Sequence, residues 1–361
     1  MIERFFPPQI VKSVLFWSIG FLLISMMGFF LALIFHKLKL KIKERKKNRL
    51  RFRNNLRIRK FLQEIEHNPP IPQTKTEYEV VADLCIQCLF ESDGKEQERI
   101  KEYIRKIQLV PYLKKLSRSF FRRKRIYGVK KLGFLQLPEL KDYWMELLSS
   151  DVPDEIKWEV IRALSFIADR EALERITEEL SSDIYSAKFY EQIYRNVIQN
   201  FRQKGILYEF VFFMEAIKDT EKMPLSLKKS ILESCGNAHL KEASWVVKDY
   251  FFHYREKPEI RITCIRVLGR LGTEELCGMV SRGLFDEDWR VRAVAARSVS
   301  MCDGQVVSHL RNLLYDDSYY VRINAAFTLS CLGKEGHSVL TEEKNSRDEF
   351  VNQTVQYMIE K

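Results

Sequence analysis

An uncharged apolar run opens the hydrophobic pattern of this chain. Between Lys12 and His36, residues 13–35 carry no charged side chain. As a helix rising about 1.5 Å per residue this run spans roughly 34 Å, and the hydrocarbon core of a bilayer is about 30 Å thick. The run exceeds the apolar region of a signal peptide, about 7–15 residues, and a buried soluble helix is rarely apolar on every face. The pattern therefore predicts a transmembrane helix over residues 13–35.

Basic residues gather on one flank of this run. Residues 36–60 contain 13 Lys or Arg against a single acid, whereas residues 1–12 contain two basic residues and one acid. Because positive flanks stay in the cytoplasm, we expect a short extracytoplasmic tail at 1–12, the remaining chain on the cytoplasmic side, and localisation to the cell (inner) membrane. The basic run is a topology signal, and it also offers contacts to anionic lipid headgroups. The candidates for these contacts are Lys37, Lys39, Lys41, Lys43, Arg45, Lys46 and Lys47.

The net positive charge of the chain lies in this basic flank. The whole chain has a net charge of +11, of which residues 36–60 supply +12, so the remainder sums to about −1. A basic isoelectric point would suggest nucleic acid if the charge covered a folded domain. Its concentration in one segment argues against a nucleic-acid partner.

The remaining pattern is helical. Residues 36–66 predict a basic juxtamembrane helix, which the prolines at 69, 70 and 72 end, so residues 67–76 are expected to form a linker. From 77 to 361 the apolar positions recur at i, i+3, i+4 and i+7, in runs separated by short polar breaks. This region is therefore expected to be one nearly all-helical domain.

Three segments of that domain repeat one another: residues 258–272, 288–303 and 318–333. Each has an aliphatic residue followed by arginine, and small or apolar residues follow three, four and seven positions later. These arginines are Arg261, Arg292 and Arg322, at spacings of 31 and 30 residues. The same frame fits residues 151–168 with Lys157 at the arginine position, and weaker matches lie near Lys124, Lys188, Leu227 and Asn352. The pattern predicts about eight helical pairs.

This repeat resembles the HEAT-like repeat family, in the short form also found in phycobilin lyases. The resemblance implies an all-α fold, an α-solenoid of stacked antiparallel helix pairs, here preceded by one transmembrane helix. It also implies a structural ladder of acid–base pairs. The pairs expected here, each six residues apart, are Asp151 with Lys157, Asp286 with Arg292, and Asp316 with Arg322. An acid in the turn can also accept from free N–H groups at the next helix start. Because Arg255 stands six residues before Arg261, the ladder is expected to break there.

Catalytic motifs are missing from the sequence. The six histidines form neither the His-Glu dyads of HEAT-repeat metal hydroxylases nor a zinc-protease pair, and no phosphate-binding or dinucleotide-binding glycine loop occurs. The seven cysteines are expected to be reduced, mostly core residues of a cytoplasmic domain. The sequence therefore predicts no enzyme activity, no metal and no cofactor.

The function predicted is that of a membrane-anchored cytoplasmic HEAT-repeat scaffold that binds a partner protein. The partner expected is an integral-membrane client, such as a polysaccharide-synthesising or signalling enzyme. Trp289, Tyr319 and Tyr320 are candidate partner contacts, although such aromatics also serve as core or repeat-interface residues. The alternative is an enzyme or ligand carrier, bilin-lyase-like, that uses the concave groove of the solenoid. A second basic cluster at residues 120–125 remains open to phosphates, acidic partners, the membrane or solvent alone.

Overall fold

The computed structural model describes residues 8–63, 68–92, 94–182, 185–272, 274–299 and 306–360. Over these ranges the chain forms α-helices α1 to α19 and three short 3₁₀ turns, and no β-strand. The all-α fold is thereby confirmed. Its contacts divide the chain into two compact units, residues 1–135 and 136–361, and the boundaries predicted at 35/36, 66/67 and 76/77 all fall within the first.

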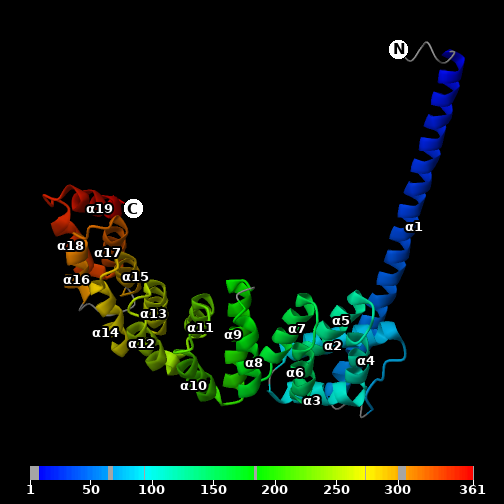
Figure 1. The fold of residues 1–361 in the computed structure, drawn as a ribbon, viewed down its shortest axis with the longest axis horizontal. Helices are drawn as coiled ribbons and strands as arrows, with labels where there is room; N and C mark the ends of the chain where they lie inside the picture. The colour runs from blue at the N-terminus through cyan, green and yellow to red at the C-terminus, as the bar shows by residue number, and fades with distance from the viewer. Residues whose placement is uncertain are drawn as a thin grey trace. The chain divides into compact units, whose positions relative to one another are not determined.

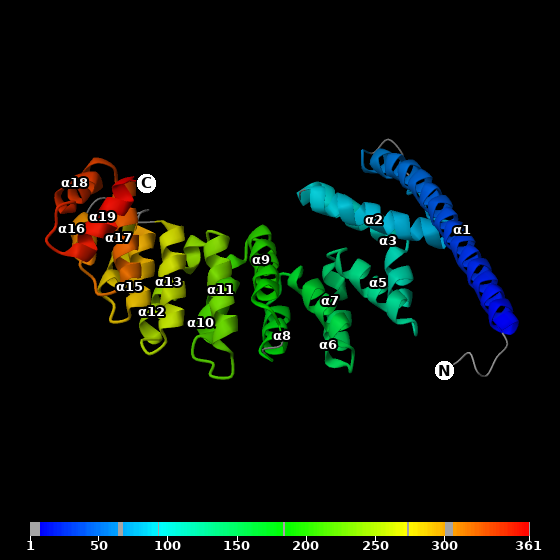
Figure 2. The same ribbon diagram turned by 90° about the horizontal axis from the view of Figure 1, so that it is seen from above.

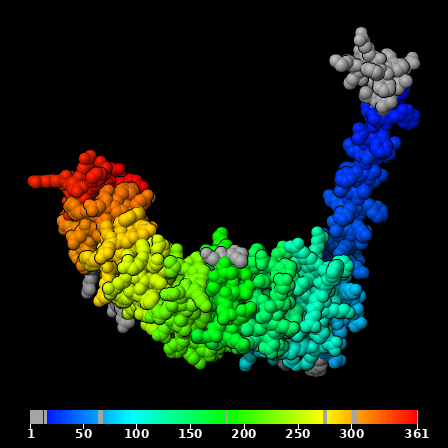
Figure 3. Space-filling model, in the orientation of Figure 1, coloured from blue at the N-terminus to red at the C-terminus, as the bar shows by residue number. Residues whose placement is uncertain are grey.

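Helix α1 (Pro8–Leu62) is continuous through the predicted apolar and basic segments. No proline occurs between Pro8 and Pro69. Every residue of α1 after Pro8 can therefore donate its backbone N–H to the helix. Among the described residues, α1 is the one helix long and apolar enough to cross a membrane, and no part of its apolar window is buried. In Figure 3 this stretch stands clear of the rest of its own unit.

The rest of the first unit packs against the basic half of α1. It comprises α2 (Lys75–Glu91), α3 (Gly94–Lys106), α4 (Leu109–Ser117) and α5 (Arg122–Gly133). Helix α2 packs against α1: Arg53 pairs with Glu77 in the first turn of α2, and Lys47 pairs with Asp83 at 3.3 Å. Basic residues of α1 thus bind acids of α2 directly, which holds α2 against the long helix.

The predicted linker is packed and not free. Within its described part, Pro70 and Pro72 are buried, and the Tyr103 hydroxyl donates to the Pro70 carbonyl at 2.9 Å. Thr74 then caps α2 by accepting from the backbone N–H of Glu77 at 3.2 Å, and the Glu77 carboxylate accepts from the N–H of Gln73 at 3.0 Å. This reciprocal arrangement resembles a capping box, which fixes where α2 begins.

The second unit is a stack of helix pairs in sequence order (Figures 1 and 2). The pairs are α6 (Lys141–Ser149) with α7 (Asp154–Ser165), α8 (Arg170–Leu180) with α9 (Ala187–Gln203), α10 (Leu207–Ile217) with α11 (Leu225–Asn237), α12 (Ser244–His253) with α13 (Pro258–Leu271), α14 (Glu274–Arg282) with α15 (Trp289–Ser298), α16 (Val307–Leu313) with α17 (Tyr319–Cys331), and α18 (Gly333–Glu343) with α19 (Glu349–Glu360). The second helix of each pair packs on the second helix of the next, from α7 to α19. These helices, together with α5 of the first unit, contain or begin at all eight segments that the sequence pattern singled out.

The small residues of the repeat lie where these second helices approach one another. A Cβ added at Gly269 on α13 would come within 2.8 Å of the Ser298 Cβ on α15. Between α17 and α15, Thr328 donates to the Ala296 carbonyl at 2.7 Å, and Asn324 donates to the Ala293 carbonyl at 2.9 Å. Side chains can reach a neighbouring backbone only if the facing residues are small. The Gly and Ala positions are therefore requirements of stacking.

Candidate functional site

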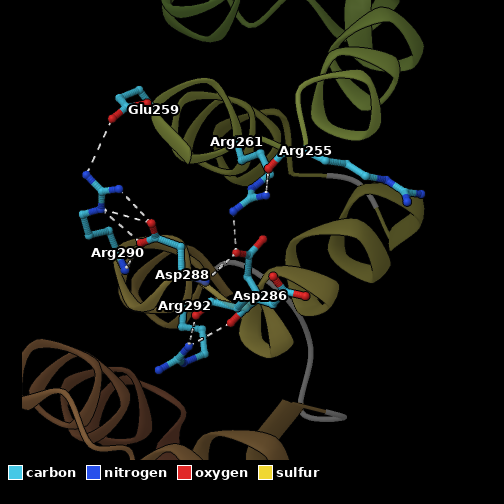
Figure 4. A network of polar contacts seen from close by, with 8 residues as sticks. Arg255, Glu259, Arg261, Asp286, Asp288, Arg290 and Arg292 are labelled. Atoms are coloured by element: carbon cyan, nitrogen blue, oxygen red, sulfur yellow. Dashed lines mark hydrogen bonds and ion pairs between the residues drawn. The ribbon is translucent and has the colours of Figure 1, made fainter. Parts of the chain in front are cut away.

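Two arginines each join successive repeats of the second unit, and Figure 4 shows one of these joints, between Arg261 and Asp286. Arg292 donates from Nε and Nη2 to the carboxylate of Asp316 in the following repeat, at 2.7 and 3.1 Å. Its Nη1 donates to the backbone carbonyl of Asp286 in its own repeat at 2.8 Å. Arg261 repeats both contacts one step earlier, with the Asp286 carboxylate at 2.8 Å and with the carbonyl of Arg255. Each guanidinium thus binds a carboxylate of the following repeat and a backbone carbonyl of its own repeat.

This geometry corrects the pairing expected from the sequence. The carboxylate of Asp286 binds Arg261, and that of Asp316 binds Arg292, so each acid pairs with the arginine of the preceding repeat. The offset of six residues brings the guanidinium to a backbone carbonyl, which every residue type supplies. The expected break at Arg261 is therefore wrong: Figure 4 shows the Arg255 side chain directed away while its carbonyl accepts the bond.

The aspartates have a second role that was expected. Asp286 accepts from the backbone N–H of Asp288, and Asp316 accepts from that of Ser318, both at 2.9 Å. Asp288 in turn caps α15 by accepting from the N–H of Arg290 at 2.8 Å. Acceptance by turn acids at the helix starts is thereby confirmed, and it holds each carboxylate in place for the arginine.

The ladder changes character at its C-terminal end. Arg322 donates to the carbonyls of Asp316 and Asp317 at 2.8 and 3.1 Å, as its predecessors do in their own repeats. The residue 30 positions after Asp316 is Ser346, which offers no carboxylate. The Arg322 guanidinium instead lies over the ring of Phe350, 5.1 Å from its centroid, a cation–π contact.

Towards the N-terminal side, lysines occupy the same position. Lys157 pairs with Glu179 at 3.3 Å, 22 residues later, whereas Asp151, its expected partner, is exposed. Lys228 is buried, and its Nζ donates to the carbonyls of Lys218 and Thr220 and to the Tyr254 hydroxyl. Burial lowers the pKa of Lys228.

The sequence reasoning did not select Lys228 as a ladder residue. A signal was present, because Pro224 begins the segment four residues earlier, much as Pro258 precedes Arg261 by three. The same spacing of four residues separates Pro153 from Lys157, so the position of Lys228 could be read from the sequence.

The three candidate partner-binding aromatics come together at the starts of α15 and α17. The exposed fractions are 42% for Trp289, 54% for Tyr319 and 60% for Tyr320. The rings of Trp289 and Tyr320 stack with centroids 5.5 Å apart, and Tyr319 meets Tyr320 edge-on at 5.8 Å. Trp289 and Tyr319 each stand three residues before a ladder arginine. We call Trp289, Tyr319 and Tyr320 the aromatic row.

A shallow cavity of about 640 Å³ adjoins the aromatic row. Trp289, Arg292 and Asp317 line it, together with three further polar residues of the two turns. The surface therefore combines large rings with fixed charges of both signs. Such a combination is typical of a protein-binding surface, in which aromatics and arginines contribute much of the affinity.

The candidate headgroup contacts all lie on α1, past its apolar stretch. Lys37, Lys39, Lys41, Lys43 and Arg45 are exposed. Lys47 lies farthest from the apolar stretch and is committed in part to its ion pair with Asp83.

The cysteines differ in their surroundings, and Cys88 is free and half-buried, with its pKa raised by burial. Cys85, Cys235 and Cys264 are buried, and burial raises the pKa of each thiol, which keeps it protonated and unreactive. Cys331 is exposed and free. Cys277 is disulfide-bonded, so the prediction that every cysteine is reduced is wrong there, because spacing alone does not show which thiols the fold brings together. Cys302 lies outside the described residues. In the part of the chain that the structure describes, no three His, Cys, Asp or Glu side chains are placed to hold a metal.

Comparison with known proteins identifies the repeat. Residues 252–330 match the HEAT-repeat family, and this stretch holds Arg261, Arg292 and Arg322, so the resemblance drawn from the arginine frame is confirmed. No curated protein sequence matches the chain.

Several solved structures are similar to this chain at low identity. The karyopherin Kap121p bound to the extreme C-terminus of the protein phosphatase Cdc14p is 10% identical with a TM-score of 0.45, over 83% of this chain and 39% of that one. The complex of CpcE and CpcF of phycocyanin lyase from Nostoc is 13% identical with a TM-score of 0.25, over 82% and 98%. An engineered protein is 16% identical with a TM-score of 0.35, over 80% and 95%.

Proposed function

We propose that this protein is a membrane-anchored scaffold whose HEAT repeats bind a partner protein on the cytoplasmic side. The observation that carries the proposal is the aromatic row, three large rings that the fold leaves exposed on the edge of the ladder. Exposed Trp and Tyr clusters beside arginine are the residues that contribute most affinity in protein interfaces. The ladder beneath them holds the helix starts rigidly, so binding would cost little ordering of the backbone.

The anchor is proposed from α1. Its apolar stretch is uncovered by the protein, and the basic flank from Lys37 to Lys47 follows it immediately. In this proposal the flank sets the orientation and touches anionic headgroups, at roughly 1 kcal/mol for each basic residue near the surface. A tether raises the effective concentration of the repeats toward other proteins of the same membrane. An integral-membrane client, such as a polysaccharide-synthesising or signalling enzyme, is therefore the partner we propose.

A binding role, not a catalytic one, also agrees with how the polar residues are used. The ladder arginines and aspartates form hydrogen bonds with one another and with the backbone. Their contacts hold repeats together, and the buried thiols are kept protonated. The charged groups of the ladder are thus accounted for by stacking.

Position-specific photo-crosslinking tests the proposal. A photoreactive phenylalanine analogue replaces Tyr320 in the full chain, expressed at native level in its own membrane. The matched control carries the analogue at Lys334, an exposed position at the start of α18. We expect one membrane protein crosslinked from position 320 and none from position 334. Equal crosslinking from both positions, or recovery of the protein alone, contradicts a specific partner at the aromatic row. A small molecule co-purifying with the repeats would instead favour a ligand carrier.

A further inference from the structure

A cavity of about 800 Å³ lies in the first unit, between the start of α2 and the hairpin of α4 and α5. Its lining includes residues from Gln73 to Glu79 on one side and from Tyr112 to Tyr127 on the other. The volume is in the range of small-molecule sites, about 300–1,000 Å³. Nothing in the proposed scaffold role uses this cavity.

The cavity is strongly cationic. Lys75, Lys115, Arg123 and Lys124 line it, against a single acid, Glu79. Lys75, Lys115 and Arg123 are exposed, and none of them forms an ion pair with a described residue. Four cations near one another against one carboxylate leave a net positive charge in the cavity, and an anion would reduce their repulsion.

The surrounding sequence strengthens this charge. Residues 103–138 contain 11 basic and no acidic residues. The near-neutral sum beyond the membrane flank therefore hides an uneven distribution. Residues 136–361 hold 30 basic and 37 acidic side chains, a net charge of −7, so the positive excess of the chain lies wholly within its first unit. The basic cluster at 120–125 supplies Arg123 and Lys124 to the cavity.

Aromatic rings form the other part of the wall. Tyr78 and Tyr112 stack with centroids 4.6 Å apart and planes at 22°, and the ring of Tyr127 also lines the cavity. Burial raises the pKa of Tyr112 and of Tyr127, so both phenols are neutral at physiological pH. Neutral rings beside cations suit a ligand that carries a planar group next to its charge.

The position along α1 distinguishes the sources of such a ligand. The Arg53–Glu77 pair fixes the first turn of α2, which borders the cavity, at the level of Arg53. Arg53 is 18 residues past Phe35, or roughly 27 Å along a helix. If α1 spans the membrane as proposed, the apolar core of that membrane lies well away from the cavity. We take the ligand to come from solution, and the test below separates it from anionic headgroups, which the flank reaches up to Lys47.

We propose that this cavity binds a soluble phosphate ester that carries a planar ring. Lys115, Arg123 and Lys124 bind the phosphate, and the ring rests against Tyr78 and Tyr112. The bound ligand joins α2 to the α4–α5 hairpin and so stabilises the first unit by mass action. The source of the ligand rests on the proposed membrane anchor, whereas the cavity and its charge do not.

Calorimetric titration tests this site in the full chain, held in nanodiscs of zwitterionic lipid. The probes are adenosine monophosphate, inorganic phosphate and adenosine. We expect adenosine monophosphate to bind more tightly than either part alone. Arg123→Gln, at an exposed position, should weaken that binding about tenfold, because a hydrogen bond between charged groups is lost. Tyr112→Leu should weaken it as well, whereas Tyr112→Phe should not.

The matched control is Lys130→Gln, which removes the same charge from the same helix outside the cavity lining. It should leave the affinity within about twofold. Equal losses in Lys130→Gln and Arg123→Gln would overturn the site, because only the general positive charge would then matter. Binding of inorganic phosphate as tight as that of adenosine monophosphate would overturn the role of the rings. Displacement of adenosine monophosphate when the nanodisc lipids are made anionic would overturn the soluble source. None of these outcomes depends on a partner of the aromatic row, so this site and the scaffold proposal can fail separately.

Discussion

Arg292 and Asp316 belong to successive repeats and are joined by two charge-assisted hydrogen bonds of 2.7 and 3.1 Å. The same guanidinium holds the Asp286 carbonyl of its own repeat at 2.8 Å. One side chain therefore fixes the turn from which its helix begins and the turn of the next repeat. Hydrogen bonding to Asp316 raises the pKa of Arg292, so the charge persists at any physiological pH.

Removing Arg292 should weaken the stack strongly. In Arg292→Ala the largely buried carboxylate of Asp316 loses its counter-charge, which costs about 2–4 kcal/mol of unfolding free energy. The matched control is Arg290→Ala, two residues away, because the Arg290 side chain that pairs with Asp288 and Glu259 is 43% exposed. That variant should have the same urea midpoint as the wild type. Urea unfolding followed by circular dichroism measures both, and equal midpoints for Arg292→Ala and the wild type would contradict a structural ladder.

The backbone contact of Arg261 leads to a separate prediction. Because Arg261 binds the carbonyl of Arg255 and not its side chain, Arg255→Ala should leave the urea midpoint unchanged. Arg261→Ala should lower the midpoint as Arg292→Ala does, since Asp286 then stays buried without its partner. A large loss in Arg255→Ala would show that the side chain, not the carbonyl, supports this joint.

The α1–α2 junction should weaken in acid. Burial raises the pKa of Glu77, but the N–H of Gln73 and the guanidinium of Arg53 lower it further, so the net pKa lies below its ordinary value of 4.5. A carboxyl whose folded pKa is depressed stabilises the fold above its unfolded pKa and loses that contribution as the pH falls through the folded one. Unfolding midpoints between pH 6 and pH 3 should fall less in Glu77→Gln than in the wild type. Parallel pH profiles would contradict this linkage.

The orientation in the membrane can be read from Cys331, which is exposed and free. A basic flank places the repeats in the cytoplasm, whereas a disulfide such as that of Cys277 is typical of oxidising compartments. We expect a membrane-impermeant maleimide to label Cys331 in inverted vesicles and not in intact cells. The control is Cys331→Ser, which should abolish that labelling. Labelling in intact cells would reverse the proposed topology.

Most of the fold could be predicted from the sequence, because stacking constrains it residue by residue. Ala296 had to be small for Thr328 of α17 to reach its carbonyl on α15, and Arg261, Arg292 and Arg322 had to recur at the length of one repeat. Both the small residues at helix contacts and the recurring arginines are visible in the periodicity and spacing of the sequence. The eight segments that the frame marked are helices for this reason.

The pairing within the ladder could not be read in the same way. A separation of six residues suggested a pair inside one repeat, but the acid that meets Arg292 lies 24 residues later. That distance depends on the length of the intervening helix and on the stacking angle, which local spacing does not contain. The cavity of the first unit was hidden for the same reason, since Tyr78 and Tyr112 meet only after α2, α3 and α4 have packed.

The central claim is that the aromatic row binds a membrane partner. Affinity purification of tagged Tyr320→Ala from native membranes tests it most directly, beside Tyr208→Ala, which removes another exposed tyrosine with one edge-on ring contact. Both variants should stay in the membrane fraction with wild-type unfolding midpoints. As the central claim requires, we expect Tyr208→Ala to retain a stoichiometric membrane partner and Tyr320→Ala to lose most of the bound partner. Full retention of the partner by Tyr320→Ala would contradict it.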